Sequence, residues 1–427
     1  MVNINNNKIK GLGGIKRAYL NNTLMFQAFK KNEEVISPYD ITSTFNVTST
    51  TSPTKVCNKT TAFTEMYVDD VQIDVASGYT FNTTGEHTVN YKLSDKTKIG
   101  TSTYQSCSAL TLVNIYDSVT NIGSYAFQSC SSLTSVTIPD SVINIGYGAF
   151  SNTPFYNNLP NGEIYLGSCY YKYKGTMPSN TSITIKDGTK SISSNAFDGC
   201  SGLTYITIPS SITSIGNNAF YGCSGLTSVT IPSSVTTIGM GTFSNCSGLK
   251  YMDIPSSVTS IGTQAFYKCS GLTNVTIPDS VSSIGGSVFY GCSSLKAITI
   301  PQNFSSNIES STFAGCTSLT EIVIPDSVPS INGSAVFSGC TSLQKITIGS
   351  GVTSIGDNSS FGFLSKSIFT GCTNLREITC LAPTAPTLLK KSIQGIEKNG
   401  GTLYIPQGSD YSTWKAILTS WTIQYIT

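Results

Sequence analysis

Cysteine is the residue type in this sequence with the most chemical potential, and most of its cysteines recur at a regular spacing. The chain of 427 residues contains 13 cysteines. Seven consecutive ones, from Cys200 to Cys340, are separated by 23, 23, 23, 23, 24 and 24 residues. Ten cysteines follow an aromatic residue by three positions: Cys107, Cys130, Cys200, Cys223, Cys246, Cys269, Cys292, Cys316, Cys340 and Cys372.

A disulfide framework is the first chemistry that such a cysteine count suggests in a secreted protein. One cysteine per repeat argues against it, because the side chains of a ladder point parallel to one another rather than toward one another. We therefore interpret the ten as buried free thiols that act as small apolar side chains. Cys57, Cys169 and Cys380 lie outside the regular spacing, and the sequence leaves their redox state open.

Catalysis has few suitable residues in this sequence. The only histidine, His87, alternates with Val89, Tyr91 and Leu93, so we expect a packed or partly exposed strand residue. A Ser-His-Asp or Cys-His arrangement would have to use that one residue. The chain also lacks the CxxC and HExxH patterns of zinc sites. We predict that the protein is not an enzyme and has no catalytic residues, no metal and no cofactor.

Two further candidates for chemistry are weak. Asp69 and Asp70 are adjacent, and neighbours in a strand face opposite sides, so shared acid–base work is not expected. A solvated turn and a weak surface cation site both stay open for this pair. Gly11, Gly13 and Gly14 precede neither a helix nor a Lys-Ser/Thr pair, so they form no phosphate-binding loop.

The regular spacing itself predicts the elements that hold these residues, because a period of this length is typical of a solenoid. In the unit after Cys200, the segment 203–208 alternates threonine with β-branched residues and predicts a strand that Pro209 ends. Residues 212–215 predict a second short strand, and Gly216 a turn where a side chain would obstruct. A single unit buries too little to fold alone, so we expect ten or eleven stacked coils.

The repeated phrases SLTSVTIPDSV and GLTSVTIPSSV, with a cysteine three residues before the leucine, resemble the BspA-like class of leucine-rich repeats. The resemblance covers residues 105–380, with an irregular coil at about 151–192 that includes the segment Tyr170 to Ile192. It implies a β-rich leucine-rich-repeat solenoid of about 23-residue coils. It also implies a protein of the kind found on the surfaces of gut and oral bacteria, in some protists and in phages.

The two ends of the chain differ from the repeats. Residues 37–104 predict a β-rich cap in which the runs 71–75 and 87–93 form a hairpin that covers the first coil. Residues 381–427 predict a C-terminal cap, in which Trp414 and Trp421 pack internally.

Residues 1–36 predict an attachment hairpin, with two short strands around Asn21 and Asn22. The segment 8–27, KIKGLGGIKRAYLNNTLMFQ, resembles N-terminal segments of phage tail and other virion structural proteins. It also lacks the apolar core of a signal peptide.

Composition excludes two classes of partner. Only 11% of residues are charged and the formal net charge is +2, so no basic footprint for nucleic acid exists. No apolar run approaches the length of a membrane span, so we expect no membrane insertion.

Surface residues are therefore the candidates for binding. The residue between the last two apolar positions of the LxxVxI strand is usually threonine, as at Thr207 and Thr230, and β-propensity alone explains that. The position two residues earlier varies from coil to coil. If this face binds a ligand, its best local cluster consists of Tyr205, Lys250, Tyr251 and Asp253. A second candidate set follows the phenylalanine of each coil, and turn packing explains it equally well: Tyr221, Tyr267 and Tyr290.

These observations predict a non-enzymatic adhesion protein. The first hypothesis is a phage virion-associated protein, in tail or head, that is present in multiple copies. It would attach to other virion structural proteins through its N-terminal segment and would present the repeats to a bacterial surface glycan or protein. The alternative is a bacterial cell-surface or secreted BspA-like adhesin. The sequence names neither the ligand nor the carrier structure.

Overall fold

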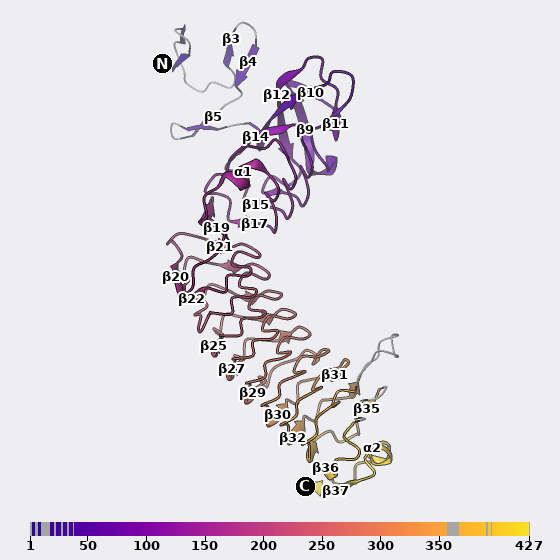
Figure 1. Ribbon diagram of the computed structural model, residues 1–427. Helices are drawn as coiled ribbons and strands as arrows, with labels where there is room; N and C mark the ends of the chain where they lie inside the picture. The colour runs from indigo at the N-terminus through magenta and orange to yellow at the C-terminus, as the bar shows by residue number, and fades with distance from the viewer. Residues whose placement is uncertain are drawn as a thin grey trace. The chain divides into compact units, whose positions relative to one another are not determined.

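The computed structural model describes residues 2–4, 7–9, 18–20, 23–26, 29–31, 34–36, 38–356, 367–389, 392–393 and 395–426, with backbone alone before residue 38. The chain forms two compact units (Figure 1). Unit 1 comprises Met1–Pro160 with Leu166–Cys169, and unit 2 comprises Asn161–Tyr165 with Tyr170–Thr427. Each unit is described below by itself.

Three antiparallel strand pairs occupy the N-terminal residues of unit 1. The second pair joins Leu20 to Thr23 and Ala18 to Phe26, which confirms two strands at the places that the sequence predicted. The turn residues Asn21 and Asn22, like the three glycines at positions 11, 13 and 14, lie outside the described residues. The pairs are β1 (Val2–Ile4) with β2 (Asn7–Ile9), β3 (Ala18–Leu20) with β4 (Thr23–Phe26), and β5 (Phe29–Lys31) with β6 (Glu34–Ile36).

A six-stranded sheet follows, in the order β10-β9-β12-β7-β14-β16. Strand β7 pairs with β12 on one side and with β14, a strand of the first coil, on the other. The cap and the first coil therefore share one sheet. The bounds are β7 (Ile41–Val47), β9 (Phe63–Val68), β10 (Val71–Ile73), β12 (Gly85–Leu93), β14 (Leu110–Ile115) and β16 (Ser135–Thr137).

The predicted hairpin between residues 71–75 and 87–93 is wrong. Strand β10 pairs with β9, and β12 pairs with β9 and β7 but not with β10. Asp69 and Asp70 cause the difference, because both have positive φ (47° and 66°) and form a two-residue turn that folds β10 back directly onto β9. Of the two interpretations left open for this pair, the solvated turn is the one that the structure shows.

The remaining elements of unit 1 are short. Threonine 153 caps the single helix turn α1, where its Oγ1 accepts a hydrogen bond from the backbone N–H of Tyr156 at 3.1 Å. These elements are β8 (Thr54–Lys55), η1 (Thr60–Ala62), β11 (Gly78–Tyr79), the parallel row β13 (Lys98–Ile99), β15 (Asn121–Ile122) and β17 (Asn144–Ile145), and α1 (Pro154–Asn158).

Unit 2 is a stack of coils in which each coil contributes a strand to one or both of two rows. The first row, which we call the strand face, follows one side of the unit in Figure 1. It consists of β20 (Thr181–Thr184), β22 (Leu203–Thr207), β25 (Tyr251–Asp253), β27 (Asn274–Thr276), β29 (Ala297–Thr299), β30 (Glu321–Ile324), β32 (Lys345–Ile348), β34 (Glu377–Cys380), β36 (Gly401–Pro406) and β37 (Trp421–Ile426).

The second row of unit 2 is built from shorter strands, most of them two residues long. It begins with a sheet of order β18-β19-β21-β23 and continues as β24-β26-β28 and β31-β33-β35. Its strands are β18 (Gly162–Leu166), β19 (Cys169–Lys174), β21 (Ser191–Ile192), β23 (Ser214–Ile215), β24 (Thr237–Ile238), β26 (Ser260–Ile261), β28 (Ser283–Ile284), β31 (Ser330–Asn332), β33 (Ser354–Gly356) and β35 (Thr387–Leu388).

The predicted solenoid is confirmed, with a spacing of about 23 residues and about 14 turns rather than ten or eleven. The sequence undercounts because the coils around residues 151–192 and after Cys372 lack a cysteine at the regular position. Gly216 is required at its turn, because a Cβ there would lie 2.4 Å from the backbone nitrogen of Ser194 on the preceding coil.

Aromatic rings form the central column of the core in each unit. In unit 2 the rings of Phe197, Phe220 and Phe243 stack at 5.2 and 5.3 Å with interplanar angles of 5° and 1°. The column continues to Phe369, and in unit 1 a shorter column begins at Tyr104. Each ring therefore packs between its equivalents on the adjacent coils, which a single coil cannot provide.

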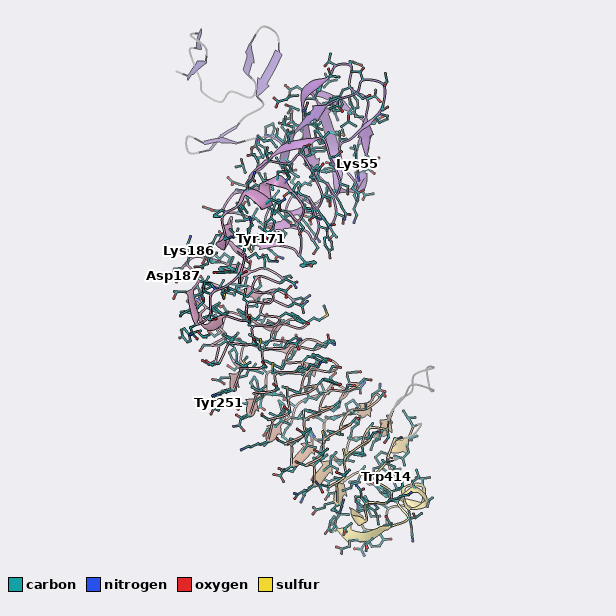
Figure 2. All side chains as sticks on the ribbon, in the orientation of Figure 1. Lys55, Tyr171, Lys186, Asp187, Tyr251 and Trp414 are labelled. Atoms are coloured by element: carbon teal, nitrogen blue, oxygen red, sulfur yellow. The ribbon has the colours of Figure 1, made fainter. Side chains whose placement is uncertain are left out.

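The C-terminal coils end in the helix α2 (Ser412–Ile417) and strand β37. Trp414 is fully buried, and its indole N–H donates to the Pro386 carbonyl at 3.2 Å. The Trp421 indole donates to the Ile396 carbonyl at 3.0 Å. Both tryptophans therefore pack inside the cap, as predicted, and Figure 2 labels Trp414.

Candidate binding surface

The 13 cysteines are all free and buried. The thiol of Cys269 donates to the carbonyl oxygen of Phe243 on the preceding coil at 3.0 Å. Burial raises the pKa of the Cys269 and Cys316 thiols to about 12. A thiol with so high a pKa is almost entirely protonated at neutral pH, so the ladder offers no nucleophile and no metal ligand. The same free and buried state holds for the three cysteines whose redox state the sequence left open: Cys57, Cys169 and Cys380.

His87 joins the β9–β10 turn to strand β12. Its Nδ1 lies 2.7 Å from Asp69 Oδ2, and its Nε2 lies 2.9 Å from the carbonyl oxygen of Thr83 and 3.2 Å from the Thr83 hydroxyl. The ring packs on Phe81 with 4.5 Å between centroids. Of the two Thr83 oxygens, the carbonyl oxygen is the nearer to Nε2. The contacts of His87 with Asp69 and Thr83 therefore tie the β9–β10 turn to strand β12 and to the loop before it.

The Asp69–His87 pair was not predicted from the sequence, because the two residues are separated along the chain and meet only through the β9–β10 turn. Among the described residues, no group of three or more His, Cys, Asp or Glu side chains could hold a metal ion. The same part of the chain contains no helix that is long and apolar enough to cross a membrane.

The cluster predicted on the strand face is exposed. Tyr251, labelled in Figure 2, is 62% exposed and Tyr205 is 53% exposed. Lys250 and Asp253 are exposed and lie next to Tyr251 in the chain. Lys250, Tyr251 and Asp253 lie together at strand β25, whereas Tyr205 lies two coils away in β22. Between them, at the equivalent position of the intervening coil, stands Ser228.

The threonine position is exposed along much of the same face. Parallel pairing aligns Asp253, Thr276 and Thr299 on three successive coils. Val323 interrupts the row with an apolar side chain that is 51% exposed. Further along, Lys345 forms an ion pair with Glu377 at 2.6 Å across adjacent strands, a pairing that the sequence did not predict. The charges of Lys345 and Glu377 are therefore already paired with each other.

The second candidate set lies apart from this cluster, on the turns that follow the core phenylalanines. Tyr221 is 41% exposed. The rings of Tyr267 and Tyr290 stack on each other at 4.8 Å with an interplanar angle of 12°, and both are half-buried. The Lys268 ammonium lies 5.4 Å from the centre of the Tyr267 ring. Contacts within the protein thus cover part of these rings, as turn packing predicts.

The coil geometry has a match among protein families. The model for the BspA-type leucine-rich repeat region, which describes six repeat copies, matches over residues 34–157, 97–174, 168–272 and 248–363, which together span more than half of the chain. The chain belongs to this family. BspA-type repeat proteins are typically surface adhesion or binding proteins, often at the cell surface or secreted, and are generally not enzymes.

Solved structures of leucine-rich repeat proteins are similar in sequence. A Treponema pallidum protein is 29% identical, over 41% of this chain and 82% of its own, with a TM-score of 0.37. A Bacteroides ovatus protein is 28% identical, over 82% and 90%, with a TM-score of 0.35. A cell surface protein of Faecalibacterium prausnitzii is 28% identical, over 78% and 83%, with a TM-score of 0.34. No curated protein matches the chain.

The comparisons bear unequally on the two functional hypotheses. They support the BspA-type repeats and a surface-binding class of protein. They give no support to the resemblance of the N-terminal segment to phage tail proteins, and the family match begins only at residue 34. The bacterial surface hypothesis is therefore the better supported of the two.

Proposed function

We propose that this BspA-type repeat protein is a non-enzymatic adhesin of a bacterial cell surface, or a secreted one, and that it binds its ligand on the strand face of unit 2. The observation that carries the proposal is the exposed cluster of Tyr251, Lys250 and Asp253. It lies on a repeat scaffold whose cysteines are all buried. Tyrosine supplies a flat apolar surface with a polar tip, and the two charges add a donor and an acceptor.

The geometry of the repeats favours this face over the others. Its outward positions change from coil to coil, while the inward positions keep the same apolar residues and the same buried cysteines. A surface of this kind varies without loss of stability, which suits recognition. The turn tyrosines are less suited, because Tyr267 and Tyr290 already cover each other.

The purified chain, fluorescently labelled, tests the proposal by its binding to intact bacterial cells and to arrays of surface glycans and proteins. We expect saturable binding that Tyr251→Ala weakens. Tyr147→Ala is the matched control, since Tyr147 is 43% exposed but lies in unit 1, outside the strand face. Absence of saturable binding to any of these surfaces would refute the proposal.

A second candidate is attachment to a phage particle through the N-terminal residues. The antiparallel pairing of β3 with β4 supports it, because the hairpin lies where the sequence resembles virion proteins. Mass spectrometry of purified virions and of bacterial envelopes separates the two carriers. Recovery from virions would favour the second candidate, and recovery only from envelopes or culture medium would favour the first.

A further inference from the structure

The strand face of unit 2 is interrupted between Tyr205 and Tyr251. Strand β22 pairs with β20, and β25 pairs with β27, but the coil between β22 and β25 forms no strand in this row and contributes to it only the single bridge from Thr230 to Asp253. The hydrogen bond from the Thr227 N–H to the Thr204 carbonyl is long, at 3.4 Å. The backbone is therefore less tightly paired at the point that the exposed side chains of Tyr205 and Tyr251 flank.

The interruption does not follow from the local sequence. The heptapeptide LTSVTIP occurs at residues 133–139 and at residues 226–232. In the first copy it contains strand β16, whereas the second copy contains no strand. The neighbours differ, because Tyr205 and Tyr251 flank the second copy in the row, whereas Leu112 precedes the first copy.

Tyr205, Ser228 and Tyr251 form one outward column, which we call the tyrosine column. The three residues are spaced by 23 positions and all are exposed. Serine is small, so the column has two exposed aromatic side chains with a low polar floor between them. In the described part of the chain no ring or cation packs on either tyrosine, unlike the stacked pair of Tyr267 and Tyr290.

Hydrogen-bonding groups surround the column. Thr207 and Thr230 present exposed hydroxyls beside it, and Lys250 and Asp253 present one ammonium and one carboxylate. Within the described residues none of these four side chains has a hydrogen-bond partner. One cation and one anion give the surface no net charge, so it does not select for an anionic ligand.

The coil spacing sets the length scale of the column. Adjacent coils here are 5.2 and 5.3 Å apart, as measured between the Phe197, Phe220 and Phe243 rings. One pyranose residue of an extended β-linked polysaccharide advances by a similar length. The faces of such sugars carry C–H groups, which suit the aromatic rings of the two tyrosines. Their rims carry hydroxyls, which suit the hydroxyl, carboxylate and ammonium groups around the column.

We infer that the tyrosine column binds an uncharged, extended β-linked oligosaccharide that runs along the coil axis. One sugar packs on Tyr205, the next lies over Ser228, and a third packs on Tyr251. The inference rests on the proposed function of the strand face and specifies its ligand class. A protein ligand fits less well, because strong protein contacts require a packed and desolvated pocket at the centre of the interface.

The test uses the full chain with soluble oligosaccharides of two to six sugars in isothermal titration calorimetry. The probes are β-1,4-linked glucose and N-acetylglucosamine oligomers, with α-1,4-linked glucose oligomers and heparin fragments for comparison. We expect β-linked oligomers to bind, with affinity that rises until three sugars are present. Tyr205→Ala and Tyr251→Ala should each lower the affinity by about tenfold, and Ser228→Trp should block binding by filling the floor.

The controls separate this inference from the proposed function. Tyr147→Ala keeps the column intact, because Tyr147 is 43% exposed but lies in unit 1, and it should leave oligosaccharide affinity unchanged. If the chain binds cells or proteins but no neutral β-linked oligomer, or if heparin fragments bind and neutral oligomers do not, the tyrosine column is wrong and the adhesin proposal stands. If neither cells nor oligomers bind, both fail. Circular dichroism of each variant confirms that the solenoid is folded.

Discussion

The Sγ atom of Cys246 lies 3.1 Å from the carbonyl oxygen of Phe220, one coil earlier in the stack. That carbonyl also accepts the N–H of Cys223 at 3.1 Å, so the thiol gives a buried acceptor its second partner. Cysteine suits this position because it is small, apolar and a weak donor at once. The same thiol-to-carbonyl contact recurs at Cys130, Cys223, Cys269, Cys292, Cys316, Cys340 and Cys372.

Cys246→Ala should therefore destabilise unit 2. The substitution removes one buried heavy atom and one hydrogen bond, which together cost about 1 to 2 kcal/mol. Urea denaturation followed by circular dichroism measures the change in midpoint. Cys246→Ser is the matched comparison, because it also loses volume but keeps a donor, and it should differ from Cys246→Ala if the hydrogen bond contributes. A midpoint equal to that of the wild type in Cys246→Ala would contradict the role assigned to this thiol.

The folded protein should be nearly unreactive toward thiol reagents. Burial raises the pKa of Cys130, Cys269, Cys316 and Cys372 to about 12, and every cysteine is shielded from solvent. The thiolate is the reactive form, so both its scarcity and its inaccessibility oppose reaction. With Ellman's reagent at pH 8 we expect almost no colour from the native chain and 13 thiols after denaturation in urea.

Reducing agents provide the complementary measurement. The structure contains no disulfide among these 13 cysteines, so dithiothreitol should leave the melting temperature unchanged. A drop in melting temperature on reduction would show a disulfide and would overturn the thiol ladder.

Stability should fall at alkaline pH. In the unfolded chain a thiol ionises near its ordinary pKa of 9.0, whereas in the folded chain the pKa of Cys269 and Cys316 is about 12. Between these values the folded state binds more protons, so stability is complete below pH 9 and declines as the pH rises toward 12. Each such thiol contributes up to about 1.4 kcal/mol per pH unit.

Urea midpoints at pH 7, 9, 10 and 11 measure this decline. The double variant Cys269→Ala/Cys316→Ala is less stable at pH 7, but its midpoint should change less steeply with pH. A slope identical to that of the wild type would mean that other groups control the alkaline transition.

Two adjacent glycines give a matched test of close coil packing. A Cβ on Gly285 would lie 2.5 Å from the backbone nitrogen of Thr263, whereas the nearest atom to a Cβ on Gly286 is the Ser310 carbonyl oxygen at 3.3 Å. Backbone cannot move aside cheaply, so Gly285→Ala should lower stability by about 1 to 3 kcal/mol. Gly286→Ala should have a much smaller effect in the same urea denaturation. Equal effects would show that coil separation is not the constraint at Gly285.

The solenoid was predictable because its determinants are local and repeated. Leu203 and Ile206 are buried at the positions that the pattern assigned, and the same positions are buried on each following coil. Gly216 was predictable as a turn, although close approach to the preceding coil, rather than a positive φ, is the physical reason. The tryptophans of the cap were also assigned correctly, because an amphipathic indole in a terminal cap packs inward and finds an acceptor.

What the sequence did not predict depends on competition between segments. Residues 71–75 alternate as a strand does, but the turn at Asp69 and Asp70 decides that this strand pairs with β9. The interruption near Ser228 was equally hidden, since the heptapeptide LTSVTIP forms a strand in one coil and not in another. The exposure of Tyr205 and Tyr251 followed from the alternation of polar and apolar residues. The loss of strand pairing in the first row of the coil between them could not be predicted, because it depends on the neighbouring coils.

Left-handed backbone conformations provide the last prediction. The residue two positions before the core phenylalanine has positive φ in most coils, as at Asn218 (55°), Gly241 (60°) and Ala335 (60°). Asparagine and glycine tolerate this conformation, whereas alanine pays about 1 kcal/mol or more in steric strain. Ala335→Gly should therefore stabilise unit 2, because relief of that strain exceeds the added entropy of the unfolded chain.

The opposite sign is expected at a matched alanine with ordinary strand geometry. Ala297 is exposed in β29, so Ala297→Gly relieves no strain and should destabilise the protein by about 0.5 to 1 kcal/mol. Urea midpoints of the two variants, measured side by side, give the comparison. If both substitutions destabilise the chain, the left-handed conformation at Ala335 imposes no net cost, because hydrogen bonds such as that from the Ser338 N–H to the Ala335 carbonyl at 3.0 Å compensate for it.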